Sequence, residues 1–322
     1  MTSGLPFDDF RALAGRLPPP DASAADLVRA DLAPEALGRI ADLAAWFAAA
    51  TGRVPARVAK PVVALFAGTH TVSRRLGGTD LNTVRARIEA TAAGAAPISS
   101  LCAADNLGLS VFDLALEIPV ADITQSAALD ERAAAATMAF GMAVLATGAD
   151  LLCLGTVDGS GDVSAVALLS ALNGGTGEEW EDVGGPERAI VAEALRIHAN
   201  HLGDPLEAMR RLGGREIAAI AGAILAARTQ KVAVILDGLS ATAAATVLHA
   251  LEPAAISHCL LAGAAGPTYG RVAARIGLEP VLDFGMPGIG GVGAALATGL
   301  VKAAGEISAG AAEGRIRQAA PR

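Results

Sequence analysis

Short apolar runs that alternate with helical stretches constrain the fold of this 322-residue chain more than any other feature. None of the runs has the period of two that a half-exposed strand shows, and between them lie helical stretches such as 127–148, 216–228 and 241–251. Buried strands joined by helices are typical of a parallel sheet covered on both faces, which predicts an α/β protein. The six candidate strands are Pro61–Ala67, Leu109–Leu116, Asp150–Gly155, Lys231–Asp237, Ile256–Ala262 and Pro280–Phe284.

The two ends of the chain are predicted to lie outside this sheet. Residues 1–30 are rich in proline and alanine and are expected to form a loose lead-in, and residues 306–322 a C-terminal tail. Pro34–Ala50 carries an apolar stripe typical of one helix, with Gly52 as its stop signal. Residues 31–60 are therefore predicted to be an N-terminal helical segment, and residues 61–305 the nucleotide-binding α/β domain.

Charge and composition exclude some classes of function. The net charge is -8 and the pI about 5.2, so an acidic chain without a basic stripe is a poor candidate for binding nucleic acid. Arg210 and Arg211 end a short helical stretch and are predicted to lie on a solvated face. The N-terminus has no apolar leader, and the uncharged stretches 133–149 and 284–301 fit core helices better than membrane spans, so a cytoplasmic protein is expected.

No metal or cofactor is expected from the cysteines and histidines. Cys102, Cys153 and Cys259 stand singly in apolar runs, which suggests small buried side chains in a reducing compartment. His198 and His201 are three residues apart at a helix end, where a solvated face is favoured over a metal site because the spacing and neighbours of a zinc-binding helix are missing.

Candidate site residues follow the predicted strands, because in a parallel sheet ligands bind beyond the carboxyl ends of the strands. The turn Thr156–Asp162 is glycine-rich and opens a helix, so Gly159, Ser160 and Gly161 could hold a phosphate or simply form a tight turn. Asp162 fits an N-cap.

Three further places remain candidates. The loop Gly285–Gly293 includes Gly291 and Gly293. So many glycines are consistent either with close approach of the backbone to a ligand or another chain, or with a flexible connection, and the two interpretations are about equally favoured. Asp237 ends a strand, where it could serve the site or cap the helix that starts near Ser240. His70 ends the first strand and is the best placed histidine.

Several segments, in order, resemble one enzyme family. The run Gly277–Met286 reads GLEPVLDFGM and resembles that family's LGLEPLLDLGM; Leu212–Ala218, up to Asp237-Gly238, is a second continuous match. Residues 37–43, 65–72 and 94–113 also match, and Gly159–Ser164 resembles its GIGNTT segment. The chain thus resembles the nicotinate-nucleotide:dimethylbenzimidazole phosphoribosyltransferases, over roughly residues 31–305.

The departures from the family fall at its site. The family follows LGLEPLLDLGM with RLGEGTGA, whose Glu is the general base, and here Gly290 occupies the place of that Glu. The Glu of the family's GEMGIGNTT becomes Val157, and the Asp of its AADHG becomes Thr69. By position only, Asp158, Asp237 or Asp283 could stand in for the base that the resemblance implies.

What the resemblance implies is a fold and a reaction. The fold is a six-stranded, doubly wound parallel sheet with a small helical lobe built from the N- and C-terminal segments. The reaction transfers phosphoribosyl from nicotinate mononucleotide to dimethylbenzimidazole and yields α-ribazole phosphate for cobamide lower-ligand assembly, with Gly159–Asp162 and Ser164 at the phosphate. A homodimer is implied, or a heteromer with an intact paralogue.

Two alternatives stay open beside this enzyme. The chain could be a non-catalytic relative that binds a nucleotide or cobamide precursor, or that completes a partner's site. It could also be a related transferase that acts on another aromatic acceptor.

Overall fold

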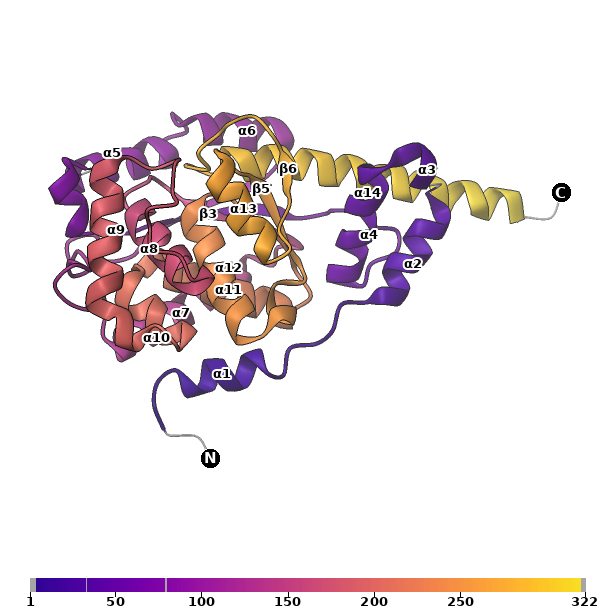
Figure 1. The fold of residues 1–322 in the computed structure, drawn as a ribbon. Coiled ribbons are helices and arrows are strands. Elements are labelled where there is room, and N and C mark those ends of the chain that lie inside the picture. The colour runs from indigo at the N-terminus through magenta and orange to yellow at the C-terminus, as the bar shows by residue number, and fades with distance from the viewer. Residues whose placement is uncertain (1–3, 33, 79, 320–322) are drawn as a thin grey trace.

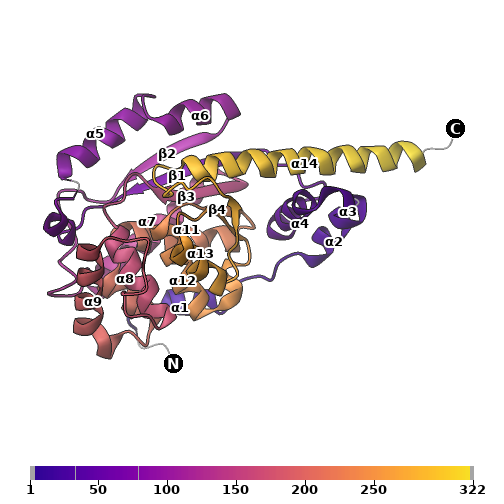
Figure 2. The same ribbon diagram turned by 45° about the horizontal axis from the view of Figure 1, so that its top comes forward.

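The computed structural model describes residues 4–32, 34–78 and 80–319 and contains a six-stranded, all-parallel sheet (Figures 1 and 2). The strand order is β2-β1-β3-β4-β5-β6. Each predicted strand is present: β1 Pro61–Ala67, β2 Gly108–Asp113, β3 Leu151–Thr156, β4 Ala233–Leu236, β5 Cys259–Gly263 and β6 Pro280–Leu282. β1, β3 and β4 are fully buried, whereas β2 is partly exposed because it is the last strand on its side of the sheet.

Helices cover both faces of the sheet, as continuous apolar strands require. In β1, Val62, Ala64 and Phe66 join one core cluster, whereas Val63 and Leu65 join the other. The first cluster includes the helices α7 Glu131–Met142, α8 Asp162–Asn173, α9 Gly185–His198, α10 Pro205–Leu212, α11 Arg215–Thr229, α12 Leu239–Leu251 and α13 Pro267–Arg275. The second includes α5 Leu81–Ala92, α6 Pro97–Asp105 and the start of α14 Val292–Ala319, which Figure 2 shows above the sheet.

The N-terminal segment is helical, so the prediction of a loose lead-in over residues 1–30 is wrong for its described part. α1 Asp8–Ala14 packs on the body through Phe7 and Phe10, and α2 Ala22–Asp31 is capped by the Asp21 carboxylate. The high content of proline and alanine in this segment suggested a loop. Two buried phenylalanines and one capping carboxylate nevertheless stabilise the two helices.

A small lobe stands beside the body, where α2, α3 Pro34–Leu37 and α4 Arg39–Thr51 pack with the second half of α14 (Figure 1). The predicted single helix Pro34–Ala50 is interrupted at Gly38, whose φ is +50°, and Gly52 ends it in the left-handed conformation as expected. The predicted C-terminal tail is also wrong to residue 319, because α14 continues without a break.

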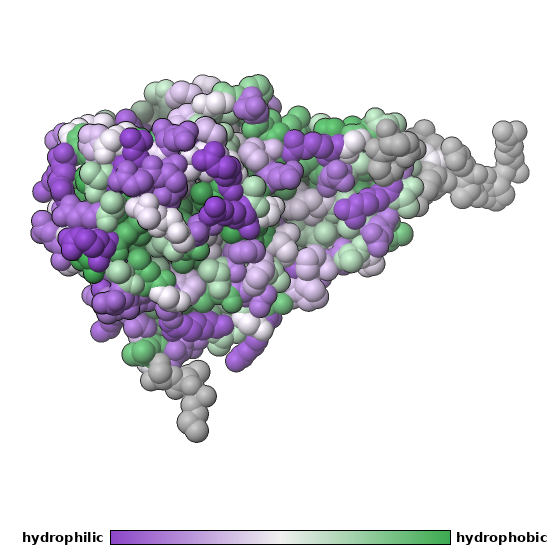
Figure 3. Space-filling view, viewed as in Figure 1, coloured by the Kyte–Doolittle hydropathy of each residue, from purple (hydrophilic) through white to green (hydrophobic). Residues whose placement is uncertain are grey.

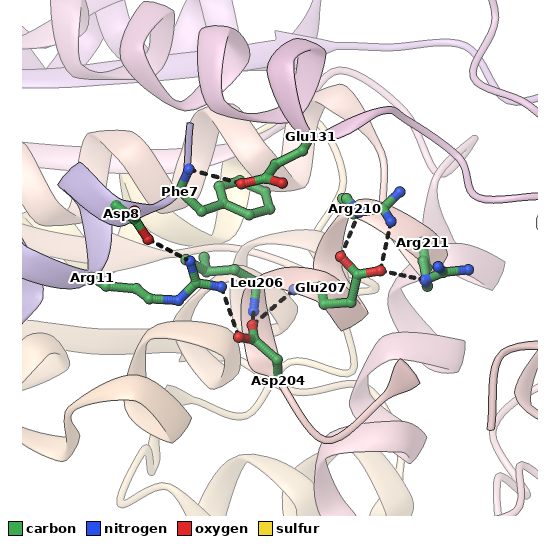
Figure 4. Close-up of polar contacts among 9 residues, drawn as sticks. All are labelled: Phe7, Asp8, Arg11, Glu131, Asp204, Leu206, Glu207, Arg210 and Arg211. Atoms are coloured by element: carbon green, nitrogen blue, oxygen red, sulfur yellow. Dashed lines mark hydrogen bonds and ion pairs between the residues drawn. The ribbon is translucent and has the colours of Figure 1, made fainter. Parts of the chain in front are cut away.

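Arg210 and Arg211 are not on a solvated face. Both guanidinium groups donate to Glu207, three and four residues earlier on α10, and each arginine side chain is only 18% exposed (Figure 4). His198 is likewise buried: its Nε2 lies 2.9 Å from the carbonyl oxygen of Ile123. Helix spacing alone could not show that neighbouring elements cover these side chains.

Two uncharged stretches of the sequence approach membrane length, and the prediction that they are core helices holds for most of the first but fails for residues 284–291 of the second. Residues 133–149 fall in α7 and the 3-10 helix η2 Ala143–Thr147, and residues 284–301 are a loop followed by the start of α14. Among the described residues, no helix has the length and apolarity that crossing a membrane requires. On the face in Figure 3, hydrophilic and hydrophobic residues are interspersed.

Candidate active site

The candidate site lies where the strand order changes direction. From β1 the chain continues to β2 on one side, and β3 lies on the other side of β1, so the loops after β1 and β3 diverge at the carboxyl edge. In open α/β sheets this switch point is the usual place for a ligand. The loops after β1, β3 and β6 all reach it.

The first cavity at this edge has a volume of about 420 Å³, within the usual range for small-molecule sites. Trp180 and Tyr269 form buried aromatic walls. Its polar lining comes mainly from hydroxyl groups, glycines and carboxylates, and no lysine or arginine is among the described residues around it. The polar and glycine lining includes Ser73, Gly78, Gly159, Ser160, Asp162, Asp182, Gly184 and Glu187.

Three helix N-termini converge on this first cavity. α8, α9 and α12 begin after Gly161, Gly184 and Gly238, and none of the three has a side-chain cap. Residues at each start line the cavity. Uncapped N–H groups and the positive ends of helix dipoles attract an anion. The backbone therefore supplies the positive charge that no lining side chain provides.

The second cavity, of about 440 Å³, lies beside the other face of the same loops and is mostly apolar. Arg87 is its one charged lining residue among those described, and Gly290 borders it. Its remaining lining is Leu65, Ala90, Thr91, Ala95, Ala96, Pro97, Ile98, Val157, Ile289 and Val292. A flat, uncharged ring suits such a surface.

Gly159 lies close to one residue from the lining of each cavity. A Cβ atom at this position would lie 2.6 Å from the Asp162 carboxylate, in the first cavity, and 3.2 Å from Cδ1 of Ile289, in the second. No side chain therefore fits at position 159 unless Asp162 or Ile289 moves.

A buried ion pair supports the floor of the site. His70 Nε2 lies 2.6 Å from Glu216 Oε1, and its Nδ1 lies 3.1 Å from Ser164 Oγ. Burial alone would lower the pKa of His70, but Glu216 outweighs it and the pKa is raised; burial would raise the pKa of Glu216, and His70 keeps it lowered. The two groups therefore form a charged pair.

Asp162 lines the first cavity and differs from the neighbouring carboxylate of Asp182, which accepts the N–H groups of Thr268 and Tyr269. Asp162 lies in the first turn of α8 and no hydrogen bond to its carboxylate is present among the described residues. Burial raises its pKa to about 7, and the neighbouring Asp158 and Glu216 add to the shift while His70 opposes it. Its interpretation as a plain N-cap is wrong, since it accepts no backbone N–H.

The predicted site residues divide into lining and supporting groups. Gly159, Ser160 and Asp162 line the first cavity, whereas Gly161, His70 and Ser164 lie behind it. Ser164 is fully buried against His70 and is not placed to meet a phosphate directly.

Asp237 supports the second glycine-rich loop. Its Oδ2 accepts the N–H of Ala294 at 3.1 Å, so it caps α14 and not the helix near Ser240; burial raises its pKa and the N–H groups of Ala294 and Gly293 oppose the shift. A Cβ at Gly291 would lie 2.8 Å from Leu65, so this glycine permits the loop to pack on β1. Asp283 is exposed.

Glu216, Arg87 and Trp180 were not among the residues predicted for the site. Glu216 carries a usable signal, because it is a carboxylate in the first turn of a mostly apolar helix that begins directly after Gly213 and Gly214. Nothing in the sequence distinguishes Arg87 from the other arginines. The described residues contain no group of three or more His, Cys, Asp or Glu side chains arranged to hold a metal ion.

Comparison with known proteins gives the family. Residues 18–315 match the model of a phosphoribosyltransferase family. This chain belongs to that phosphoribosyltransferase family. It is 51% identical over 325 residues, or 96% of each chain, to a nicotinate-nucleotide--dimethylbenzimidazole phosphoribosyltransferase of Sinorhizobium fredii, and 50% identical to one of Rhizobium meliloti.

A solved structure agrees with this membership. The phosphoribosyltransferase resembles the crystal structure of nicotinate-nucleotide-dimethylbenzimidazole phosphoribosyltransferase from Thermus thermophilus with a TM-score of 0.80 and 27% sequence identity. The match covers 89% of this chain and 94% of the other. The resemblance stated from sequence motifs, and the α/β fold that it implied, are both confirmed.

Proposed function

We propose that this phosphoribosyltransferase moves the phosphoribosyl group of nicotinate mononucleotide to dimethylbenzimidazole, in the assembly of the cobamide lower ligand. The observation that carries the proposal is the identity of half of the residues, over nearly the whole chain, with enzymes of that name. Two cavities of similar volume, both lined by residues of the loops after β3 and β6, suit a reaction between two small substrates.

The first cavity suits the nucleotide. Its phosphate would lie at the uncapped N-termini of α8, α9 and α12, which supply N–H donors without a lysine or arginine. Asp162, with its pKa near 7, is protonated in part of the molecules at neutral pH and can donate to a phosphate or ribose oxygen. The apolar second cavity suits dimethylbenzimidazole.

In the reaction a ring nitrogen of dimethylbenzimidazole attacks the anomeric carbon. The bond from that carbon to nicotinate breaks, and nicotinate leaves with the electron pair, which neutralises its pyridinium ring. The acceptor's other nitrogen gives up its proton to a base. Holding both substrates in line across Gly159 contributes through orientation, which is worth up to about 7–11 kcal/mol in favourable cases.

Overnight incubation of the purified chain with nicotinate mononucleotide and dimethylbenzimidazole, followed by chromatography, tests the proposal. We expect α-ribazole phosphate and an equal amount of nicotinate. Gly159→Val should abolish product because its side chain would displace Asp162, which lines the first cavity, and Ile289, which lines the second. Gly270→Ala is the matched control, since a Cβ there meets no atom within 4 Å. A wild-type chain that yields no product would contradict the proposal.

Gly290 favours a second candidate function. It lies where the family's RLGEGTGA segment has its base, so the chain could bind nucleotide without turnover or complete the site of an intact paralogue. Calorimetry with nicotinate mononucleotide distinguishes this case: binding without product, and product on adding a paralogue, would support it.

The assembly and location of the chain remain part of the proposal. A homodimer is expected, or a heteromer with an intact paralogue, and sedimentation velocity of the chain alone distinguishes a monomer from a dimer. Three buried free cysteines suit the reducing cytoplasm.

A further inference from the structure

Arg87 and Asp158 form an ion pair at the border of the second cavity. Asp158 Oδ2 lies 3.6 Å from Arg87 Nη1, and the Asp158 side chain is only 3% exposed whereas that of Arg87 is 48% exposed. Asp158 Oδ1 accepts the N–H of Ser160 at 3.0 Å, which fixes the carboxylate. One oxygen is thus held by the backbone and the other faces a half-exposed arginine side chain.

The second oxygen of Asp158 lacks a hydrogen bond. Oδ2 is fully buried and has no hydrogen-bond partner among the described residues, because 3.6 Å is beyond hydrogen-bond distance. A buried carboxylate oxygen left in this state costs free energy. An N–H donor that reached Oδ2 in place of the Arg87 side chain would remove that cost.

In the sequence, Asp158 stands between a residue that lines the second cavity and one that lines the first. Val157 lines the second cavity and Gly159 lines the first. The other two carboxylates considered as substitutes for the family's base are placed elsewhere, since Asp237 caps α14 and Asp283 is exposed. Asp162 lies in the first cavity, on the side proposed for the nucleotide.

We propose that Asp158 is the proton acceptor for the base bound in the second cavity, and that Arg87 covers Asp158 until that base binds. The inference rests on the proposed function. The N–H of the azole acceptor takes the place of Arg87 at Asp158 Oδ2, and Arg87 turns toward solvent. As the acceptor's other nitrogen bonds to the anomeric carbon and nicotinate leaves, the N–H proton passes to Oδ2 and its bonding electrons remain on the azole ring.

Asp158→Asn tests the proton acceptor. Asn retains the contact with the Ser160 N–H but is not basic, so we expect the kcat to fall by about 10²–10⁴-fold with the KM for nicotinate mononucleotide unchanged. Asp283→Asn, which changes an exposed carboxylate directly after β6 at the same sheet edge, is the control and should keep wild-type turnover.

A second substitution separates chemistry from structure. Gly290 has a φ of +74°, and a Cβ there would meet no atom within 4 Å, so a glutamate has room in the second cavity at the cost of backbone strain. Gly290→Glu in the Asp158→Asn background should restore at least tenfold of the lost kcat. A merely structural role of Asp158 would not be rescued in this way.

Arg87→Gln tests whether Arg87 covers Asp158 until the acceptor binds. The acceptor would no longer compete with a guanidinium group, so the KM for dimethylbenzimidazole should fall severalfold while the kcat stays within about threefold of wild type. Arg85→Gln, on the same helix and paired with the exposed Glu117, should change neither constant.

Three results would overturn the inference: full turnover in Asp158→Asn, a loss that Gly290→Glu does not restore, or a raised acceptor KM in Arg87→Gln. If the wild-type chain forms no product, the proposed function fails separately. Calorimetry with dimethylbenzimidazole alone then decides: at least tenfold weaker binding by Asp158→Asn supports Asp158 as the partner of the acceptor N–H, and unchanged binding refutes it.

Discussion

At the scale of single residues, the site concentrates negative charge away from water. Asp158, Asp162 and Glu216 lie near one another, and His70 is the one buried group that offsets them among the described residues of this cluster. Glu216 is matched by His70, whereas Asp162 has no such partner. The pKa of about 7 at Asp162 therefore means that its ionised form is destabilised in the folded protein. Such shifts are common at functional sites.

Asp162→Asn should stabilise the protein in a pH-dependent way. The pKa of Asp162 rises from 3.8 in the unfolded chain to about 7 in the folded one, so the folded state binds the proton more tightly and stability falls as the pH rises between these values. The Asp162→Asn variant lacks this fall in stability with rising pH. Its melting temperature should exceed that of wild type by an amount that grows from pH 4 to pH 7 and is constant above.

The control for this prediction is Asp283→Asn, whose melting temperature should follow that of wild type at every pH because the residue is exposed. Differential scanning calorimetry from pH 4 to pH 9 measures both. A stability difference for Asp162→Asn that is the same at pH 4 and pH 9 would refute the assigned origin of the shift.

At the scale of elements, α7 and α11 approach each other through two glycines. A Cβ at Gly222 would lie 1.9 Å from the carbonyl oxygen of Met138, and one at Gly141 would lie 1.9 Å from that of Ala219. The backbones therefore touch where the helices cross, and this contact places Arg215–Glu216, at the start of α11, beneath the site.

Gly222→Ala should destabilise the fold. The added methyl group would push the two backbones apart, which costs about 1–3 kcal/mol in a well-packed core. Gly310→Ala is the matched control in α14, where a Cβ meets nothing within 4 Å; it should stabilise by about 0.5–1 kcal/mol because alanine favours a helix. Urea unfolding of both variants gives the comparison, and equal signs of the two changes would contradict the argument.

At the scale of the whole molecule, α1 packs on the body, whereas the next helix in the sequence, α2, belongs to the small lobe. α1 packs with buried Phe7 and Phe10, Arg11 donates to Asp204 at 2.7 Å, and the N–H of Phe7 donates to Glu131 (Figure 4). The chain then runs to α2 in the small lobe (Figure 1). α14 connects the body to that lobe as one continuous helix.

Phe7→Ala should release α1 without unfolding the body. A buried phenylalanine contributes about 3–5 kcal/mol, which exceeds what the remaining polar contacts of a seven-residue helix supply. Trypsin should then cut after Arg16 in native protein much faster than in wild type, as mass spectrometry of the fragments would show. Leu5→Ala, at a side chain 53% exposed, should leave the rate unchanged; equal cleavage of all three proteins would show that Phe7 does not hold the helix.

The sequence by itself determined the layers and the edge that carries the site. Unbroken apolar runs such as Pro61–Ala67 require burial on both faces, so the number and direction of the strands follow from local patterns. Glycine-rich turns after strands follow in the same way, because tight turns and close approach both need glycine. Ordered motifs then identified the family. Sequence patterns also predicted Gly159, Ser160 and Asp162 for the site, and all three line the first cavity.

Only the tertiary structure decided which polar groups meet. Asp237 caps α14, Glu216 pairs with His70, and Arg87 reaches Asp158, and each contact joins segments more than 50 residues apart. Local pattern carries no information on such pairs, because the same carboxylate can cap a helix, hold a histidine or take a proton. The difference comes from the burial and partners that folding brings to it.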